Sequence, residues 1–130
     1  MGLDNGITVK NVTRKQLPPF IIYPFEVDFN DNVVDICYWR KWWGLRNDIV
    51  NLIHMDFETY DKRLTCADVA DISKLIWSYL ISNDIEELDH GYWEEESVRR
   101  TARINLWNLF WLRVYMRLHP NAEVYFYDSY

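Results

Sequence analysis

The 130-residue sequence contains little glycine and little cysteine, with four residues of the first kind and two of the second. So few glycines leave no glycine-rich loop of the kind that cradles phosphate groups. Cys37 and Cys66 are far apart and form no CxxC pair, so we expect two reduced thiols in an intracellular protein. The sequence therefore gives no indication of a P-loop enzyme, a disulfide scaffold or a redox motif.

Long apolar runs are also missing. No stretch of about 20 uninterrupted apolar residues exists, which argues against a membrane-spanning helix. The first residues have neither the basic start nor the apolar run of a signal peptide. From these two absences we expect a soluble, cytoplasmic protein with no membrane partner.

Recognised catalytic and metal-binding patterns are absent too, since the sequence has no HExxH or GxSxG motif. His54 with Asp56, and Asp89 with His90, are close pairs that could act as a base and its orienting group. The histidines could also join carboxylates at a metal, but none has a recognised ligand spacing. We predict no catalytic residue, no metal and no cofactor, and a small hydrolase with a His/Asp or metal site stays an alternative.

Aromatic residues are abundant instead, with seven Trp, nine Tyr and six Phe. Each buried aromatic side chain removes ~150–250 Å² from water, so residues 1–130 can form the core of a single domain. The net charge of −6 argues against general nucleic-acid binding, which depends on neutralising phosphates. The same charge favours a basic partner.

Hydrophobic periodicity and turn residues predict an α+β fold. About three helices should pack on one face of a small, mostly antiparallel sheet, with the long C-terminal helix central and enclosed on almost every side. Asp4-Asn5-Gly6 and Asn30-Asp31-Asn32 are expected to form turns. The predicted strands are 7–9, 33–39 and 122–127, and the Pro-containing segment 16–28 is predicted to be extended. The predicted helices run from about 41 to 54, from about 65 to about 82, and from after Gly91 to 118. Thr65 and Asp68 resemble a capping box with Asp in place of Glu, so Thr65 should be the N-cap of the second helix.

Four arginines of the third predicted helix form what we call the arginine seam. At about 100° per residue they fall within an arc of roughly 80°, with Leu106 and Phe110 between the two pairs. An otherwise buried helix rarely aligns guanidinium groups unless something anionic faces them. We predict an anion-binding face for a small phosphorylated ligand, and the alternative is internal pairing with the acidic segment 84–96 or ordinary solvation. The arginine seam consists of Arg99, Arg103, Arg113 and Arg117.

Aromatic and basic residues alternate in the segment Tyr38-Trp39-Arg40-Lys41-Trp42-Trp43. Trp42 belongs to the apolar stripe of the first helix, but Trp39 and Trp43 cannot both join it on the same side. Exposed indoles are typical of binding surfaces, and the alternative is a purely structural role. The candidate ligand-binding residues here are Trp39 and Trp43, and the candidate partner contacts are Arg40, Lys41 and Arg46.

The acidic segment 84–96 contains seven carboxylates and no Lys or Arg. Such a run can steer a protein toward a basic partner, although it can equally be a solvated face. We predict partner contacts at its end, at Glu94, Glu95 and Glu96.

The opening Met1-Gly2-Leu3-Asp4-Asn5-Gly6-Ile7, together with the YWRK and WGLRN patches within 38–47, resembles short uncharacterised proteins of bacterial phages and prophages. The resemblance covers about the first forty per cent of the chain and supplies no activity or catalytic residue. It implies a setting in a bacterial host cell, where small phage proteins often bind host machinery, including components of antiviral defence.

Together these features predict a noncatalytic phage-type accessory protein that binds and inhibits or modulates a host protein. The alternative is a protein that binds or sequesters a nucleotide, with the arginine seam and the tryptophans as its binding residues. Direct binding of nucleic acid is not expected.

Overall fold

The computed structural model describes residues 4–28, 32–40, 42–56, 60–82 and 95–129. Its strands are β1 (Asp4–Lys10), β2 (Val33–Arg40), β3 (Asp61–Arg63) and β4 (Glu123–Ser129), and its helices are η1 (Arg14–Gln16, a 3-10 helix), α1 (Trp43–Leu52), α2 (Cys66–Ser82) and α4 (Glu95–Leu118). The predicted turn at Asn30-Asp31-Asn32 lies largely outside these ranges.

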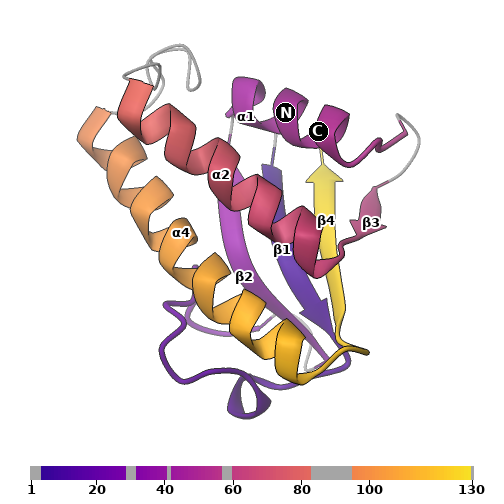
Figure 1. The fold of residues 1–130 in the computed structure, drawn as a ribbon. Coiled ribbons are helices and arrows are strands. Elements are labelled where there is room, and N and C mark those ends of the chain that lie inside the picture. Colours follow the sequence, from indigo (N-terminus) through magenta and orange to yellow (C-terminus); the bar gives the residue numbers. More distant parts are fainter. Residues whose placement is uncertain (1–3, 29–31, 41, 57–59, 83–94, 130) are drawn as a thin grey trace.

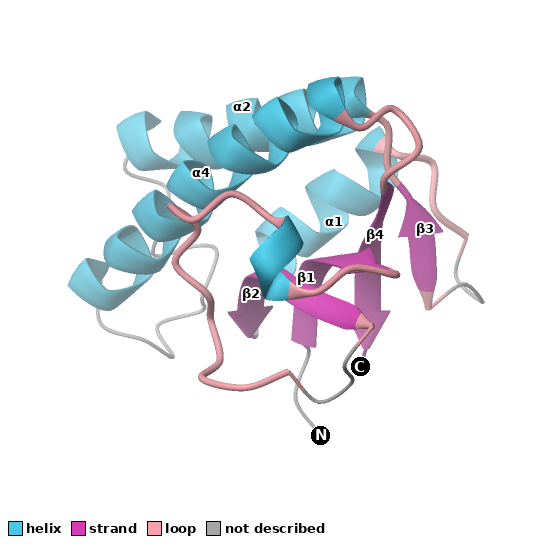
Figure 2. Ribbon diagram, turned by 90° about the horizontal axis from the view of Figure 1, so that it is seen from below, coloured by secondary structure: helices cyan, strands magenta, loops and turns pink. Residues whose placement is uncertain are grey.

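The four described strands form one antiparallel sheet in the order β2-β1-β4-β3. Helices α1, α2 and α4 all lie on one face of it, with α2 and α4 side by side (Figure 1). Seen from below, the helices form one layer and the strands the other (Figure 2). The α+β fold with helices on one face of a small antiparallel sheet is therefore confirmed.

The core lies between these two layers, and the alternating burial along β4 is what one covered face requires. Ile7 and Val9 of β1, with Val124 and Phe126 of β4, are wholly buried beneath the helices. The helices meet them with apolar stripes that are also buried. These stripes are Leu45 and Ile49 of α1, Val69, Ile72 and Ile76 of α2, and Val98, Ala102, Leu109 and Leu112 of α4. No helix in the described ranges is both long enough and apolar enough to cross a bilayer.

The start of α2 follows the predicted capping box. The Asp68 amide donates to the Thr65 hydroxyl at 3.1 Å, and the Thr65 amide donates to the Asp68 carboxylate at 2.9 Å. Two backbone donors that the first turn cannot pair are satisfied in this way. The predicted N-cap at Thr65 is confirmed.

The predicted turn at Asp4-Asn5-Gly6 is wrong, because these residues are the first part of β1. Gly6 pairs with Tyr127 of β4. A Cβ atom at position 6 would lie 2.6 Å from the Tyr127 ring and would overlap the Cys37 carbonyl oxygen. Glycine is needed here for the close approach of a ring and a neighbouring strand, and not for a turn.

The structure departs from the sequence analysis at two further places. The sequence gives no indication of strand β3, because Asp61-Lys62-Arg63 is wholly charged and carries no strand pattern. The helix α4 is not enclosed on almost every side, since Trp107, Phe110 and Leu118 are exposed. It packs on the edge strand β2 and on α2, so its remaining surface faces outward.

Candidate functional site

A groove with a volume of about 710 Å³ runs between the outward surfaces of α2 and α4. We call it the docking groove. Its α2 wall carries small residues beside one large indole, and its α4 wall alternates cationic and apolar side chains. The docking groove is lined by Ala70, Ser73, Lys74 and Trp77 of α2 and by Arg103, Leu106, Trp107, Phe110 and Arg113 of α4.

Large apolar side chains are exposed in and beside this groove. Trp77 is 57% exposed, Trp107 46% and Phe110 53%, and the neighbouring Phe20 is 55% exposed. Indoles and phenyl rings held this far out of the core leave apolar surface in water without burial. Such a patch is typical of an interaction surface.

The rings of Phe20, Trp107 and Phe110, together with the half-buried Trp111 on which they pack, form what we call the aromatic cluster. Phe20 lies 4.6 Å from Trp111 between ring centroids, Phe110 5.2 Å and Trp107 5.9 Å. The last two meet Trp111 at 85° and 70°, the edge-to-face geometry that aromatic quadrupoles favour. Trp111 therefore supports the three exposed rings, which present an ordered surface.

Hydrogen bonds from α4 hold the loop that carries Phe20. The Trp107 indole N–H donates to the Phe20 carbonyl at 2.7 Å. At the next residue, the Asn108 side-chain amide accepts from the Ile22 N–H at 2.8 Å and donates to the Ile22 carbonyl at 2.7 Å. The side chain of Asn108 also donates to the Ile36 carbonyl of β2 at 2.9 Å. The same residues of α4 therefore fix the aromatic cluster and tie the helix to the edge strand.

In the folded chain, the four arginines of the arginine seam lie in different surroundings. Arg103 and Arg113 line the docking groove, whereas Arg99 donates to the Leu80 carbonyl near the end of α2 at 3.0 Å. Arg117 is exposed in the last turn of α4. Among the described residues, no ion pair involves Arg103, Arg113 or Arg117, and the buried Nε of Arg113 has no hydrogen-bond partner there.

The docking groove is cationic in an acidic protein. Lys74 belongs to one wall and Arg103 and Arg113 to the other, and no Asp or Glu is found among the described lining residues. The whole chain carries a net charge of −6. Positive charge is thus concentrated on the same surface as the exposed aromatic rings, which suits an anionic, partly apolar ligand.

The predicted aromatic and basic segment lies elsewhere. Trp39 is only 2% exposed, and with Arg40 and Trp42 it lines a separate pocket of about 290 Å³ between β2 and the first turns of α4. Trp43 is 38% exposed at the first residue of α1. Arg40 is exposed, 3.9 Å from the Asp4 carboxylate. The indole of Trp39 therefore lies in the core, not on the surface where a stacking residue was expected.

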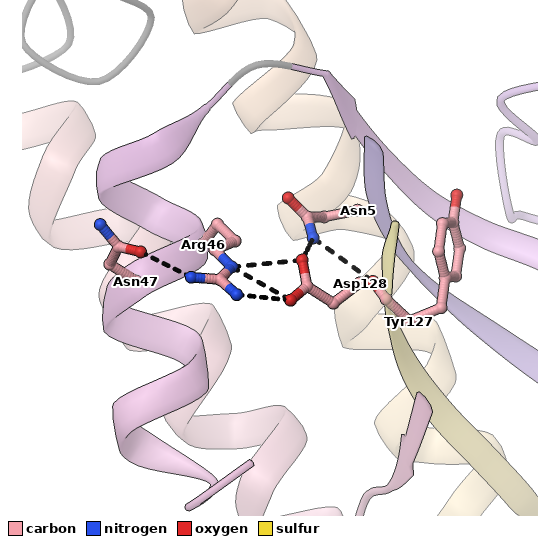
Figure 3. A network of polar contacts seen from close by, with 5 residues as sticks. All are labelled: Asn5, Arg46, Asn47, Tyr127 and Asp128. Atoms are coloured by element: carbon pink, nitrogen blue, oxygen red, sulfur yellow. Dashed lines mark hydrogen bonds and ion pairs between the residues drawn. The ribbon is translucent and has the colours of Figure 1, made fainter. Parts of the chain in front are cut away.

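Arg46 belongs to a buried polar network and not to a contact surface (Figure 3). Its guanidinium donates to the Asp128 carboxylate, at 2.7 Å in the shortest contact, and to the Asn47 side chain. Asn5 donates to the same carboxylate at 2.6 Å. Only 12% of the Arg46 side chain and 5% of the Asp128 side chain are exposed. Arg46 joins α1 to strands β1 and β4 instead of facing a partner.

The remaining predicted contacts are not described. Glu94 and Lys41 lie outside the described residues. Glu95 and Glu96 belong to the first turn of α4, but their side chains also lie outside what the structure describes. The acidic-contact hypothesis therefore stays a prediction.

The described residues bring together no group of three His, Cys, Asp or Glu side chains that could hold a metal. His54 and Asp56 are both exposed, and His119 stacks on the Tyr115 ring with centroids 4.3 Å apart. Asp89 and His90 lie outside the described ranges. Among the described side chains, neither His54 nor His119 forms an ion pair with a carboxylate.

Sequence reasoning identified Arg103, Arg113 and Phe110 but missed Lys74, Trp77 and Trp107. A signal was available for Trp77, because it lies beside Ile76 and therefore off the apolar stripe of α2. No protein-family model matches the sequence, and no curated protein or solved structure matches the chain. The case for a function therefore depends on the chemistry of the docking groove.

Proposed function

We propose that this protein is a noncatalytic binding protein whose docking groove and aromatic cluster hold a partner protein. The observation that carries the proposal is the set of exposed rings, three of them packed on Trp111, that lies beside Lys74, Arg103 and Arg113. Tryptophan and arginine dominate the energetics of protein–protein interfaces, above all where a rigid aromatic residue fills a pocket on the partner. A surface that is already ordered also loses little side-chain entropy on binding.

A protein partner fits this groove better than a small phosphorylated ligand. Arg103 and Arg113 are separated by about 15 Å along the α4 axis, with Leu106 and Phe110 between them. One phosphate group needs guanidinium groups that converge on it. Cations at the ends of a mainly apolar groove instead suit carboxylates spread over a protein surface.

The resemblance to short phage proteins supports a host protein as the partner. In this proposal the chain acts by occupying a surface of that host protein, which inhibits or modulates it. Small size and a rigid contact surface are sufficient for such a role, because binding alone blocks whatever else uses that surface.

The proposal is tested by crosslinking in the native host. A photo-crosslinking phenylalanine analogue in place of Trp77 is expected to capture a host protein, and the same analogue in place of the exposed Trp43 serves as the matched control. The captured protein is then purified and its affinity measured. Trp77→Ala should weaken binding by about 30-fold, the scale of an interface hot spot, and Trp43→Ala by no more than about twofold.

Equal capture at positions 77 and 43 would show that the docking groove is not the contact surface. The same conclusion would follow if the purified partner bound the Trp77→Ala variant as tightly as it binds the unaltered protein. Trp77 is more than half exposed, so its replacement should leave the fold intact, which circular dichroism checks.

A further inference from the structure

We infer that the segment bound in the docking groove is an acidic, amphipathic α-helix of the partner. The inference rests on the proposed function and adds the chemistry of the bound segment. It follows from the length of the groove, the position of its cations and the state of the neighbouring sheet edge.

The groove has the dimensions of a short helix. Its lining extends from Ala70 to Trp77 on α2 and from Arg103 to Arg113 on α4, which is about 10 Å and about 15 Å at the helical rise per residue. The small side chains of Ala70 and Ser73 leave room beside Trp77. Two to three turns of a helix with an apolar stripe would place side chains there, as in known helix-in-groove complexes.

The cations determine the charge of that helix. Arg103 lies at one end of the α4 wall and Arg113 at the other, and Lys74 lies on the opposite wall. A helix with acidic residues about ten positions apart would place carboxylates about 15 Å apart, matching the two arginines. The apolar residues between those acids would meet Leu106 and Phe110. Carboxylates at both ends and apolar residues between them are therefore what the groove recognises.

Two other occupants fit less well. A nucleic-acid strand carries a charge at every nucleotide, whereas the middle of the groove is apolar and the whole protein is anionic. A strand added to the sheet would need free backbone groups on an edge. Along β2, the carbonyls of Ile36 and Tyr38 already accept hydrogen bonds from Asn108 and Asn105 of α4.

The test uses three fluorescein-labelled peptides of about 16 residues, long enough for the groove and its flanks. All three peptides carry leucines at helical spacing. They differ only at the flanking positions, which hold Glu in the first peptide, Gln in the second and Lys in the third. Fluorescence anisotropy with the full chain should show the Glu peptide binding at least about tenfold more tightly than the Gln peptide, and the Lys peptide more weakly still.

Arg103→Glu and Arg113→Glu should each weaken binding of the Glu peptide by about tenfold and strengthen binding of the Lys peptide. Lys15→Glu, at an exposed lysine of η1, is the matched control and should change neither.

The inference is overturned if the Gln peptide binds as tightly as the Glu peptide, or if no peptide binds. It is also overturned if a single-stranded oligonucleotide binds more tightly than the Glu peptide, or if the protein self-associates through Trp77. In these cases crosslinking of a host protein at position 77 would leave the proposed function standing. Failure of that crosslinking would instead remove the proposed function, whatever the peptides do.

Discussion

Asp128 is the least exposed carboxylate in the described ion pairs, and it accepts from two different side chains, Arg46 and Asn5. A buried charge is costly to leave without its partner. The pair between Lys10 and Asp61 has the same chemistry at 2.6 Å, but more than a third of each side chain is exposed. The two pairs differ in solvent exposure and therefore in expected energetic weight.

We predict that Asp128→Ala lowers the free energy of unfolding by about 3 kcal/mol, because it leaves the Arg46 guanidinium buried without its carboxylate. Asp61→Ala is the matched control and should cost less than about 1 kcal/mol. The measurement is urea denaturation followed by tryptophan fluorescence. The double variant Arg46→Met, Asp128→Leu should recover much of the loss. Equal effects at positions 128 and 61 would contradict the distinction.

Asp35 gives a pH-dependent prediction at the same scale. Burial raises the pKa of the Asp35 carboxyl above 3.8, and the Asp28 carboxylate raises it further, while the Arg14 guanidinium lowers it. A raised pKa in the folded state means that the ionised carboxylate opposes folding. Stability is therefore lost as the pH rises through the interval from the unfolded to the folded pKa.

Removing that charge should reverse the effect. Asp35→Asn is expected to raise Tm at pH 7, and the gain should shrink toward zero as the pH falls below 3.8, because the Asp35 carboxyl then becomes protonated in the unfolded state as well as in the folded state. Thermal unfolding followed by circular dichroism between pH 3.5 and pH 7 measures this. A Tm difference that does not change with pH would show that Asp35 acts through packing and not through its charge.

At the scale of elements, α4 connects the core to the docking groove. One side of the helix buries Ala102, Leu109 and Leu112. Its next face carries Asn105 and Asn108, which donate to carbonyls of the edge strand β2. Its outward face carries the α4 wall of the groove. A single helix thus packs on the core, covers part of a sheet edge and forms one wall of the docking groove.

We predict that Asn108→Ala destabilises the protein by about 3 kcal/mol, because it removes the partners of the Ile22 N–H and of two carbonyls. Asn105→Ala is the matched control and should cost about 1 kcal/mol, since its amide makes one long bond to the Tyr38 carbonyl. Urea denaturation measures both. Limited proteolysis should also cut the Asn108 variant faster near Phe20. Equal stability of the two variants would contradict the proposed anchoring role.

At the scale of the whole molecule, the charge distribution sets the response to salt. The chain is acidic overall, yet the described lining of the docking groove is cationic. An acidic partner is attracted by Lys74, Arg103 and Arg113 and repelled by the rest of the protein. Because the groove's charges are the closest to that partner, their attraction should dominate at contact.

We therefore expect binding of the crosslinked partner to weaken by about tenfold between about 0.05 M and about 0.5 M NaCl, because salt screens exposed charges. Most of the loss should appear as a faster dissociation rate, because the attraction acts at contact, and stopped-flow mixing measures both rates. Trp77→Ala should lower the affinity at every salt concentration, since its contribution is apolar. Affinity that rises with salt would mean that overall repulsion governs the encounter, and would argue against the groove's cations as the contact.

Local patterns in the sequence were enough to determine most elements. The Thr65–Asp68 capping box predicted the start of α2, because both partners lie within one turn. Apolar spacing predicted the three long helices and the strands β2 and β4, because burial on one side imposes its period on the sequence. Strand β3 was missed, since its three charged residues join the sheet only through pairing with β4.

Helical periodicity also showed that Arg103, Phe110 and Arg113 share one face of α4, but it could not show what lies against that face. Only the tertiary structure decided that Trp77 of α2 lies opposite them, that Trp39 is buried, and that Arg46 meets a carboxylate 82 residues away. These outcomes depend on contacts between distant segments, and a local pattern carries no information about which distant segment covers it. The sequence by itself determined the elements and their apolar faces, and the packing of α4 at the sheet edge decided which aromatic and cationic side chains stayed on the surface.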